Sequence, residues 1–286
     1  MSAPQPTTLS DRIQQIPRHY VYLLLAGVVV WQLLFPIRLP IAPSVTTRGV
    51  YDAVAAVPDD KLIIITTDWD ASTQAETGPQ TQAVIHACFQ NHKKFVIMNL
   101  QPPMGVKLAQ DLAQEAAKEY GAVYGVDYAN WGYKYGYENV LMAMAKNIPN
   151  AIGDDGVYGK PVGQLPLMQG VEDIHDIGLV VIVTGLSAMT EMWVGLIQGP
   201  YQTPLAGAYT AVMAPIYYPY LDSNQLKGML VGAKGAAELE VMVDRPGKAI
   251  AIMNVQSWAH VLIIALILLG NVGYLFARGR GGGRQP

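Results

Sequence analysis

The sequence predicts an α/β protein, with a three-layer, mostly parallel, doubly wound (Rossmann-like) sheet flanked by one N-terminal and one C-terminal transmembrane helix. Two patterns predict it. Strand-like apolar runs alternate with helix-like periodic stretches through the middle of the chain, and a long uncharged apolar run lies near each end. The composition agrees, because 51% of the 286 residues are hydrophobic and only 14% are charged, against about 25% charged in typical soluble domains.

The expected strands are short apolar runs at residues 61–67, 94–100, 122–127, 178–184 and 207–213. Unbroken runs such as Leu-Ile-Ile-Ile at 62–65 are typical of parallel strands that are covered on both faces. The expected helices lie between them at 79–91, 104–120, 137–148 and 187–198, with a fifth at 223–243. Strands separated by helices need crossover connections, so the sheet should be mostly parallel.

The fifth helix is predicted from its first residues. Asp222 and Gln225 have the spacing of a capping box, which satisfies free backbone N–H groups at the start of a helix. Gly228, Gly232 and Ala236 then recur every four residues. A row of small side chains on a helix predicts close packing against the sheet or against a neighbouring chain.

Two apolar segments are expected to cross a membrane. As a helix, residues 19–37 would rise about 28 Å, which is close to the roughly 30 Å of a bilayer core. Residues 258–277 form the second span, with Trp258 and Tyr274 near its ends, where interfacial aromatic residues usually lie. A cleaved signal peptide is the alternative for the first segment. No small-x-small cleavage site follows its apolar run, so we expect a membrane anchor.

Arginines outside the two spans predict the topology. They are Arg12 and Arg18 before the first span, and Arg278, Arg280 and Arg284 after the second. Positive residues favour the cytoplasmic side of a membrane. We therefore expect a cytoplasmic tail at 1–18, a periplasmic or extracellular α/β domain with its linkers at 38–257, and a basic cytoplasmic tail at 278–286.

Three polar residues lie inside the predicted spans: Gln32, His260 and Asn271. A polar side chain is costly against lipid, so each is expected to contact another membrane helix. The alternative for Gln32 and His260 is that they lie close enough to the interfaces to reach lipid headgroups.

The first predicted strand ends in Thr66-Thr67-Asp68-Trp69-Asp70. In open α/β sheets, ligands bind beyond the carboxyl ends of the strands. This run resembles the first motif of the haloacid dehalogenase superfamily, in which an apolar strand ends in Asp-x-Asp. The resemblance implies that Asp68 is a nucleophile and Asp70 an acid/base, usually beside magnesium. It also implies that Thr184 serves as the Ser/Thr motif, and Gly153-Asp154-Asp155 as the acidic motif.

The acidic motif precedes Thr184 in this chain, which reverses the order in that superfamily. The alternative interpretation is structural, with Asp68 and Asp70 capping backbone amides of the first βα turn. We take this as the leading interpretation. The chain is then not expected to be an enzyme.

Other chemistry has little support in the sequence. Neither GxGxxG nor GxxxxGK[ST] occurs, and there is no GxSxG elbow, so no cofactor is expected. Cys88 is the only cysteine, which excludes an intramolecular disulfide. A formal net charge of −3 gives no basic surface for nucleic acid. Glu172, Asp173, His175 and Asp176 resemble a metal-ligand group, but a short acidic run is usually a solvated loop, so no metal is expected.

Aromatic residues gather in two runs, and six of them are candidates for a protein interface. They are Tyr128, Trp131, Tyr133 and Tyr135 in the first run, and Tyr217 and Tyr218 in the second. Both runs are expected at the same edge of the sheet. Tyrosine and tryptophan are favoured in interface cores, but ordinary packing, or stacking on a small ligand such as a sugar, would use the same residues.

These observations favour a non-enzymatic, membrane-anchored subunit of a large multi-chain membrane complex. Its partners would be the lipid bilayer and other subunits, which include further copies of this chain if the complex is a homo-oligomer. The alternatives are an extracytoplasmic hydrolase of the haloacid dehalogenase type and a sensor domain that binds a small ligand.

Overall fold

The computed structural model describes residues 17–37, 39–101 and 104–281. The chain divides into two compact units. One unit is Ile41–Ile250, which we call the α/β domain, and the other contains the chain up to Pro40 and from Ala251 onward.

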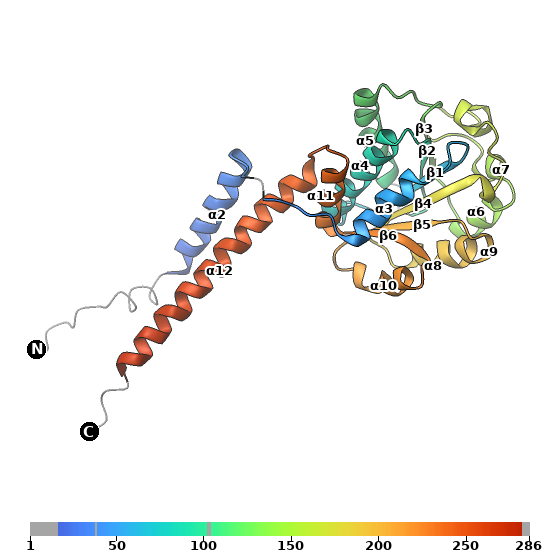
Figure 1. Ribbon diagram of the computed structural model, residues 1–286. Helices are drawn as coiled ribbons and strands as arrows, with labels where there is room; N and C mark the ends of the chain where they lie inside the picture. The colour runs from blue at the N-terminus through green and yellow to red at the C-terminus, as the bar shows by residue number, and fades with distance from the viewer. Residues whose placement is uncertain (1–16, 38, 102–103, 282–286) are drawn as a thin grey trace, which may run out of the picture. The chain divides into compact units, whose positions relative to one another are not determined.

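Six parallel strands form one sheet in the α/β domain, in the order β3-β2-β1-β4-β5-β6 (Figure 1). From the centre outward they are β1 (Leu62–Asp68) and β4 (Ile177–Thr184), β2 (Phe95–Asn99) and β5 (Leu205–Tyr209), and β3 (Tyr128–Tyr133) and β6 (Leu226–Val231). The chain builds toward one edge, returns to the centre and builds toward the other edge. This is the doubly wound order, and it confirms the predicted Rossmann-like α/β class.

Helices cover both faces of the sheet. One face is covered by α3 (Val45–Ala55), α4 (Gln74–Gln90), α5 (Met104–Tyr120) and α11 (Gly232–Met242). The other is covered by α6 (Tyr137–Met144), α7 (Ile148–Ile152), α8 (Ala188–Trp193), the π-helix η4 (Val194–Gln198), α9 (Gly199–Tyr201) and α10 (Ala214–Asp222). Three short 3₁₀ helices lie before β4: η1 (Val162–Gln164), η2 (Pro166–Met168) and η3 (Ile174–Asp176).

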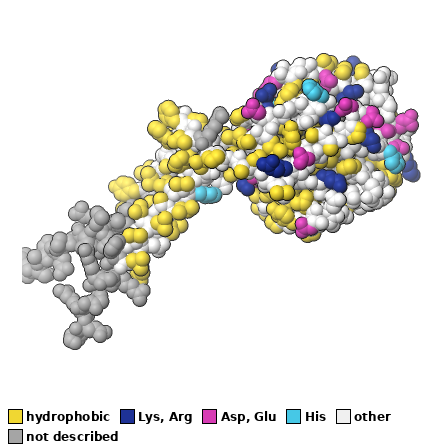
Figure 2. Space-filling view, viewed as in Figure 1, with side chains coloured by type: hydrophobic (Ala, Val, Ile, Leu, Met, Phe, Trp, Pro, Cys, Tyr) yellow, Lys and Arg dark blue, Asp and Glu magenta, His cyan; other side chains and the backbone are white. Residues whose placement is uncertain are grey.

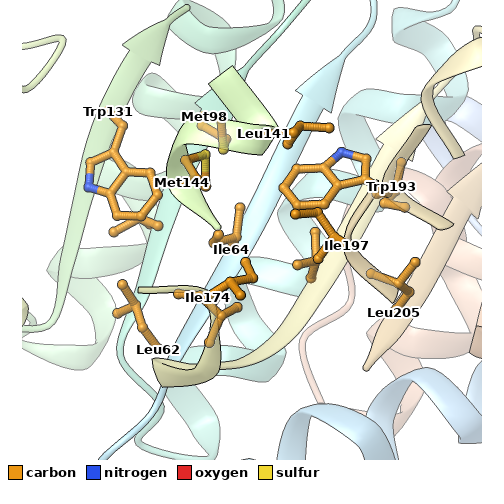
Figure 3. Packing of buried hydrophobic residues seen from close by; sticks show 14 of the residues in the cluster. Leu62, Ile64, Met98, Trp131, Leu141, Met144, Ile174, Trp193, Ile197 and Leu205 are labelled. Atoms are coloured by element: carbon orange, nitrogen blue, oxygen red, sulfur yellow. The ribbon is translucent and has the colours of Figure 1, made fainter. Parts of the chain in front are cut away.

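The strand side chains divide between two cores. Ile63 and Ile65 of β1 pack with α4 and α5 in one hydrophobic cluster, whereas Leu62 and Ile64 pack in the other. Successive side chains of a strand point to opposite faces, so an unbroken apolar run serves both cores. Figure 3 shows the second cluster, with Leu62 and Ile64 among residues of the neighbouring strands and helices.

The third strand was predicted at 122–127 and lies at Tyr128–Tyr133. Residues 122–127 form a turn instead, in which the Val126 and Asp127 N–H groups both donate to the Val123 carbonyl, and the Val123 N–H donates to the Asp127 carboxylate (2.7 Å). Local hydrogen bonds of this kind compete with strand pairing. A prediction from apolar character alone therefore puts the third strand too early in the chain.

The helix predicted at 223–243 is wrong in its first half, which is strand β6, and α11 begins only at Gly232. Asp222 ends α10 rather than opening a capping box. Gly228 lies in β6, where a Cβ atom would overlap the backbone of Val50 in α3. The small residues thus allow a helix to pack closely on an edge strand. They do not form a row on one helix.

The helix α3 was not predicted. Ser44 is its N-cap, and its side chain accepts a hydrogen bond from the Thr47 N–H. The Glu238 carboxylate of α11 accepts from the Ser44 N–H (3.0 Å), the Ser44 hydroxyl (2.5 Å) and the Thr47 hydroxyl (2.7 Å). Burial alone would raise the pKa of Glu238, but these hydrogen bonds hold the pKa below its usual value. These hydrogen bonds join the start of the α/β domain to α11.

The second unit contains α2 (Arg18–Leu34) and most of α12 (Lys248–Gly281). Within the described ranges, only Lys248–Leu275 is long and apolar enough to cross a membrane, and its 28 residues would rise about 42 Å. The helix α2 has 17 residues, at the lower limit for a membrane span. In Figure 2, apolar side chains cover most of these helices, whereas charged side chains gather on the α/β domain.

Candidate functional site

The switch point of the sheet lies between β1 and β4, which are neighbours and lead into helices on opposite faces. Ligands of doubly wound folds usually bind there, beyond the carboxyl ends of the strands. Asp68 and Thr184 end the two strands and are partners in the register. The Thr184 hydroxyl donates to the Asp68 carbonyl (2.9 Å) and accepts from the Leu186 N–H (2.9 Å). The Thr184 hydroxyl is thus used within the fold both as a donor and as an acceptor.

The carboxylate of Asp68 is fully buried and holds the connection after β2. Its Oδ1 atom accepts hydrogen bonds from the Leu100 N–H (2.7 Å) and the Gln101 N–H (2.9 Å). Burial raises the pKa of Asp68 to about 6, although the two backbone donors act in the opposite direction. The sequence interpretation expected Asp68 to cap the turn after its own strand. The structure shows that Asp68 instead accepts hydrogen bonds from the turn after the neighbouring strand β2.

Asp70 shapes its own turn, as the structural interpretation predicted. Its carboxylate accepts from the Ser72 hydroxyl (2.6 Å) and the Ser72 N–H (2.8 Å), and these bonds lower the pKa of Asp70. Asp68 and Asp70 therefore make separate sets of contacts, to different loops.

The residues of the proposed acidic motif are engaged elsewhere. The Asp155 carboxylate accepts from the Tyr124 hydroxyl (2.9 Å) and from the N–H groups of Val157, Tyr158 and Lys160. Burial alone would raise the pKa of Asp155, but these donors keep the pKa below its usual value. Among the described residues, no group of three or more His, Cys, Asp or Glu side chains is placed to hold a metal ion.

The acidic run after residue 171 caps a short helix. The Asp173 carboxylate accepts from the His175 N–H (2.8 Å), and the Asp176 carboxylate accepts from the Glu172 and Asp173 N–H groups. The two aspartates form a capping box on η3. Asp173 and Asp176 thus accept hydrogen bonds from the backbone at the start of η3.

Side chains of this chain fill the space at the start of α4, where doubly wound folds usually hold a phosphate. Thr73 packs against Gly185 in the loop after β4. The Glu76 carboxylate accepts from the Ala211 N–H (2.8 Å) in the loop after β5. The buried Gln80 amide donates to the Tyr209 carbonyl (2.8 Å) and the Gly232 carbonyl (3.0 Å). The loops at the carboxyl ends of β1, β4, β5 and β6 are therefore joined to one another.

The six aromatic interface candidates divide into buried and exposed residues. The buried ones are Tyr128, Trp131 and Tyr217, with exposed fractions of 3%, 0% and 0%, and the exposed ones are Tyr133, Tyr135 and Tyr218, with 40%, 88% and 44%. The prediction that both runs lie at one edge is wrong. The first run belongs to β3 and the residues after it, whereas α10, which holds Tyr217 and Tyr218, joins β5 to β6 at the opposite edge.

A cavity of about 540 Å³ opens at the carboxyl ends of β2 and β3, and we call it the tyrosine cavity. Its lining consists of Leu100, Gln101, Tyr133, Tyr135, Gly136, Tyr137, Glu138 and Asn139. The Gln101 N–H is one of the two that Asp68 binds, so the buried carboxylate supports one wall of the cavity. The sequence indicated these tyrosines but gave no sign that they share a cavity with residues after β2.

The polar residues of the two segments predicted to cross a membrane have different surroundings. The buried Gln32 side chain accepts from the Ile37 N–H (3.1 Å), beyond the end of its own helix. Asn254, which the sequence analysis missed, is buried and accepts from the Leu39 N–H (3.3 Å). His260 and Asn271 are exposed on α12. Neither has a side-chain hydrogen bond among the described residues.

No protein-family model matches this chain, and no curated protein matches it.

Proposed function

We propose that this chain is a non-enzymatic subunit of a multi-chain membrane complex, anchored by α2 and α12 with both termini in the cytoplasm. The α/β domain would then lie in the periplasm or outside the cell. The observation that carries the proposal is Asn271, an exposed amide within the apolar stretch of α12 that follows His260.

The amide of Asn271 has two donors and one acceptor, which lipid cannot satisfy. It lies in an apolar stretch whose neighbours Leu269, Val272 and Leu275 are all exposed. A polar side chain in this setting usually faces another helix, where a hydrogen bond stabilises the pair by about 0.6 to 2 kcal/mol. A helix from a second subunit would supply the missing partner.

The α/β domain supports a role in association rather than catalysis. At the switch point, Asp68, Glu76 and Gln80 bind backbone groups of this chain. At the far edge of the sheet, three apolar side chains on and before α10 are exposed: Val212 (83%), Ile216 (48%) and Tyr218 (44%). We assign this α10 surface to contact with another subunit, because exposed aromatic and aliphatic groups are typical of interface cores.

We expect the chain, extracted in mild detergent, to migrate as a particle far heavier than its own 31.0 kDa. Asn271→Leu should shift the particle toward smaller sizes, because it removes the polar group that requires a partner. The measurement is size-exclusion chromatography with light scattering. Val272→Leu is the matched control, since it changes the adjacent exposed position from one apolar residue to another. A monodisperse monomer in several mild detergents, for wild type and both variants, would contradict the proposal.

The orientation can be tested separately. Alkaline phosphatase fused after residue 286 should be inactive, because it would remain in the cytoplasm, whereas a cytoplasmic fluorescent reporter at the same point should be active. The physical reason is the positive charge of Arg278, Arg280 and Arg284 after the second span. An active phosphatase fusion would reverse the assigned topology and leave the assembly proposal to be judged on particle size.

A further inference from the structure

Two cavities of similar size lie at opposite ends of the sheet. One, of about 570 Å³, lies at the amino ends of the strands, and none of the described residues that line it is aromatic. The other is the tyrosine cavity, of about 540 Å³, with Tyr133, Tyr135 and Tyr137 in its lining. Both volumes fall within the usual range for small-molecule sites. The aromatic lining and the position at the carboxyl ends of the strands favour the tyrosine cavity as a binding site.

Tyr133 and Tyr135 are exposed at the cavity, whereas Tyr137 is half-buried and packs against the hydrophobic cluster of this face. In the part of the chain that the structure describes, none of them stacks on another ring or forms a side-chain hydrogen bond. The buried tyrosines behave differently. Tyr209 stacks on Tyr217, with ring centroids 3.9 Å apart, and its hydroxyl bonds with that of Thr190. The rings of Tyr133 and Tyr135 are therefore available to a ligand.

The backbone beneath the cavity is fixed from two sides. The Gln101 N–H is bound by the buried carboxylate of Asp68, and the Lys134 N–H donates to the Asn99 carbonyl (2.9 Å). Gly136 has φ +79° and turns the chain between Tyr135 and Tyr137. A site on a fixed backbone loses little conformational freedom when a ligand binds.

We propose that the tyrosine cavity binds a neutral saccharide. The face of an aromatic ring is negative and attracts the polarised C–H groups on the apolar face of a sugar ring. Gln101, Glu138 and Asn139 add amide and carboxylate groups that match sugar hydroxyls.

Charge and exposure narrow the class of ligand. Among the described residues, the cavity lining includes Glu138 but no Lys or Arg, which disfavours acidic sugars and phosphates. A cage for a quaternary ammonium ion would use the same rings. Such a cage encloses its ligand, whereas Tyr135 is 88% exposed and Tyr133 is 40% exposed. Open platforms of this kind suit one face of a sugar ring.

The test uses the full chain in a polyoxyethylene detergent, because detergents with sugar headgroups would compete for the site. Maltotriose, cellotriose, mannotriose and N,N′,N″-triacetylchitotriose are each titrated by isothermal calorimetry, with choline chloride as the cationic probe. We expect at least one trisaccharide to bind, and Tyr135→Ala to weaken that binding by about tenfold or more, in line with the cost of losing an aromatic stacking partner. Tyr158→Ala, which changes a 62% exposed tyrosine outside the cavity lining, is the matched control and should bind normally.

Tyr137→Phe keeps the ring and removes the hydroxyl, so it should retain most of the affinity if ring stacking dominates. Circular dichroism of each variant checks that the domain remains folded, which the exposure of Tyr135 leads us to expect. The proposal is overturned if no trisaccharide binds, if binding is equally affected by Tyr158→Ala, or if choline binds in a Tyr135-dependent way and the sugars do not.

Discussion

Replacing Trp131 with alanine should lower the free energy of unfolding of the α/β domain by about 3 to 5 kcal/mol. The side chain is completely buried in β3 and belongs to the same cluster as Leu141 and Met144 of α6. Figure 3 shows Trp131 at one side of this cluster and Trp193 at another. Truncation would remove the largest side chain of this region and leave a cavity that the rigid sheet cannot close.

The amount by which truncation lowers the free energy of unfolding distinguishes a core residue from an interface residue. Trp131→Phe should cost much less than Trp131→Ala, because it keeps most of the apolar volume, and the indole nitrogen has no hydrogen-bond partner among the described residues. Tyr135→Ala, at an exposed position, should change stability by less than about 0.5 kcal/mol. Urea unfolding followed by far-ultraviolet circular dichroism measures all three variants. A stable Trp131→Ala domain that has lost its partners would restore the interface role expected from the sequence.

Asp68 should make the stability of the domain depend on pH between about 4 and 7. Burial raises the pKa of Asp68 from 3.8 to about 6 in the folded state. The folded state therefore binds this proton more tightly than the unfolded chain does. Its stabilising contribution is complete below about pH 4 and is lost as the pH rises through 6. A change of about two in pKa corresponds to about 3 kcal/mol.

Asp68→Asn tests this effect, because an amide oxygen still accepts from Leu100 and Gln101 but cannot ionise. Relative to wild type, the variant should gain up to about 3 kcal/mol of stability between pH 4 and pH 7.5. Asp70→Asn is the control. The hydrogen bonds from Ser72 lower the pKa of Asp70, so the ionised Asp70 carboxylate stabilises the fold at higher pH. Asp70→Asn should therefore lose stability relative to wild type as the pH rises. Parallel pH profiles for wild type and Asp68→Asn would show that the carboxylate is not buried as described.

The central strands were predictable because their side chains serve two cores. Residues 62–65 and 179–183 are unbroken apolar runs, and both lie within the predicted strands. The edge strand β6 was not predicted, because Lys227 and Gly228 break its apolar run and Gly232 continues a false helical spacing. Its strand conformation comes from pairing with β5 and from the close approach of α3, and neither contact is visible in the local sequence.

The site was predictable only where its contacts are local. The turn at Asp70 involves Ser72, two residues away, and was expected from the residue types alone. Asp68 instead binds amides more than thirty residues away, after the adjacent strand. The division of the tyrosines into buried and exposed groups likewise depends on which of them fall within β3 and α10. That division required the correct boundaries of these elements, and the predicted third strand ended before Tyr128.

The contact between α3 and β6 constrains how this protein is made. Glu238, which holds Ser44, follows it by 194 residues, and β6 is the last strand of the sheet. During synthesis, α3 leaves the ribosome well before the strand against which it packs. Contacts over such a separation form late, because a long loop must close before they contribute any stability. The apolar face of α3, including Val50 and Val54, therefore has to be kept from wrong partners until nearly the whole domain has emerged.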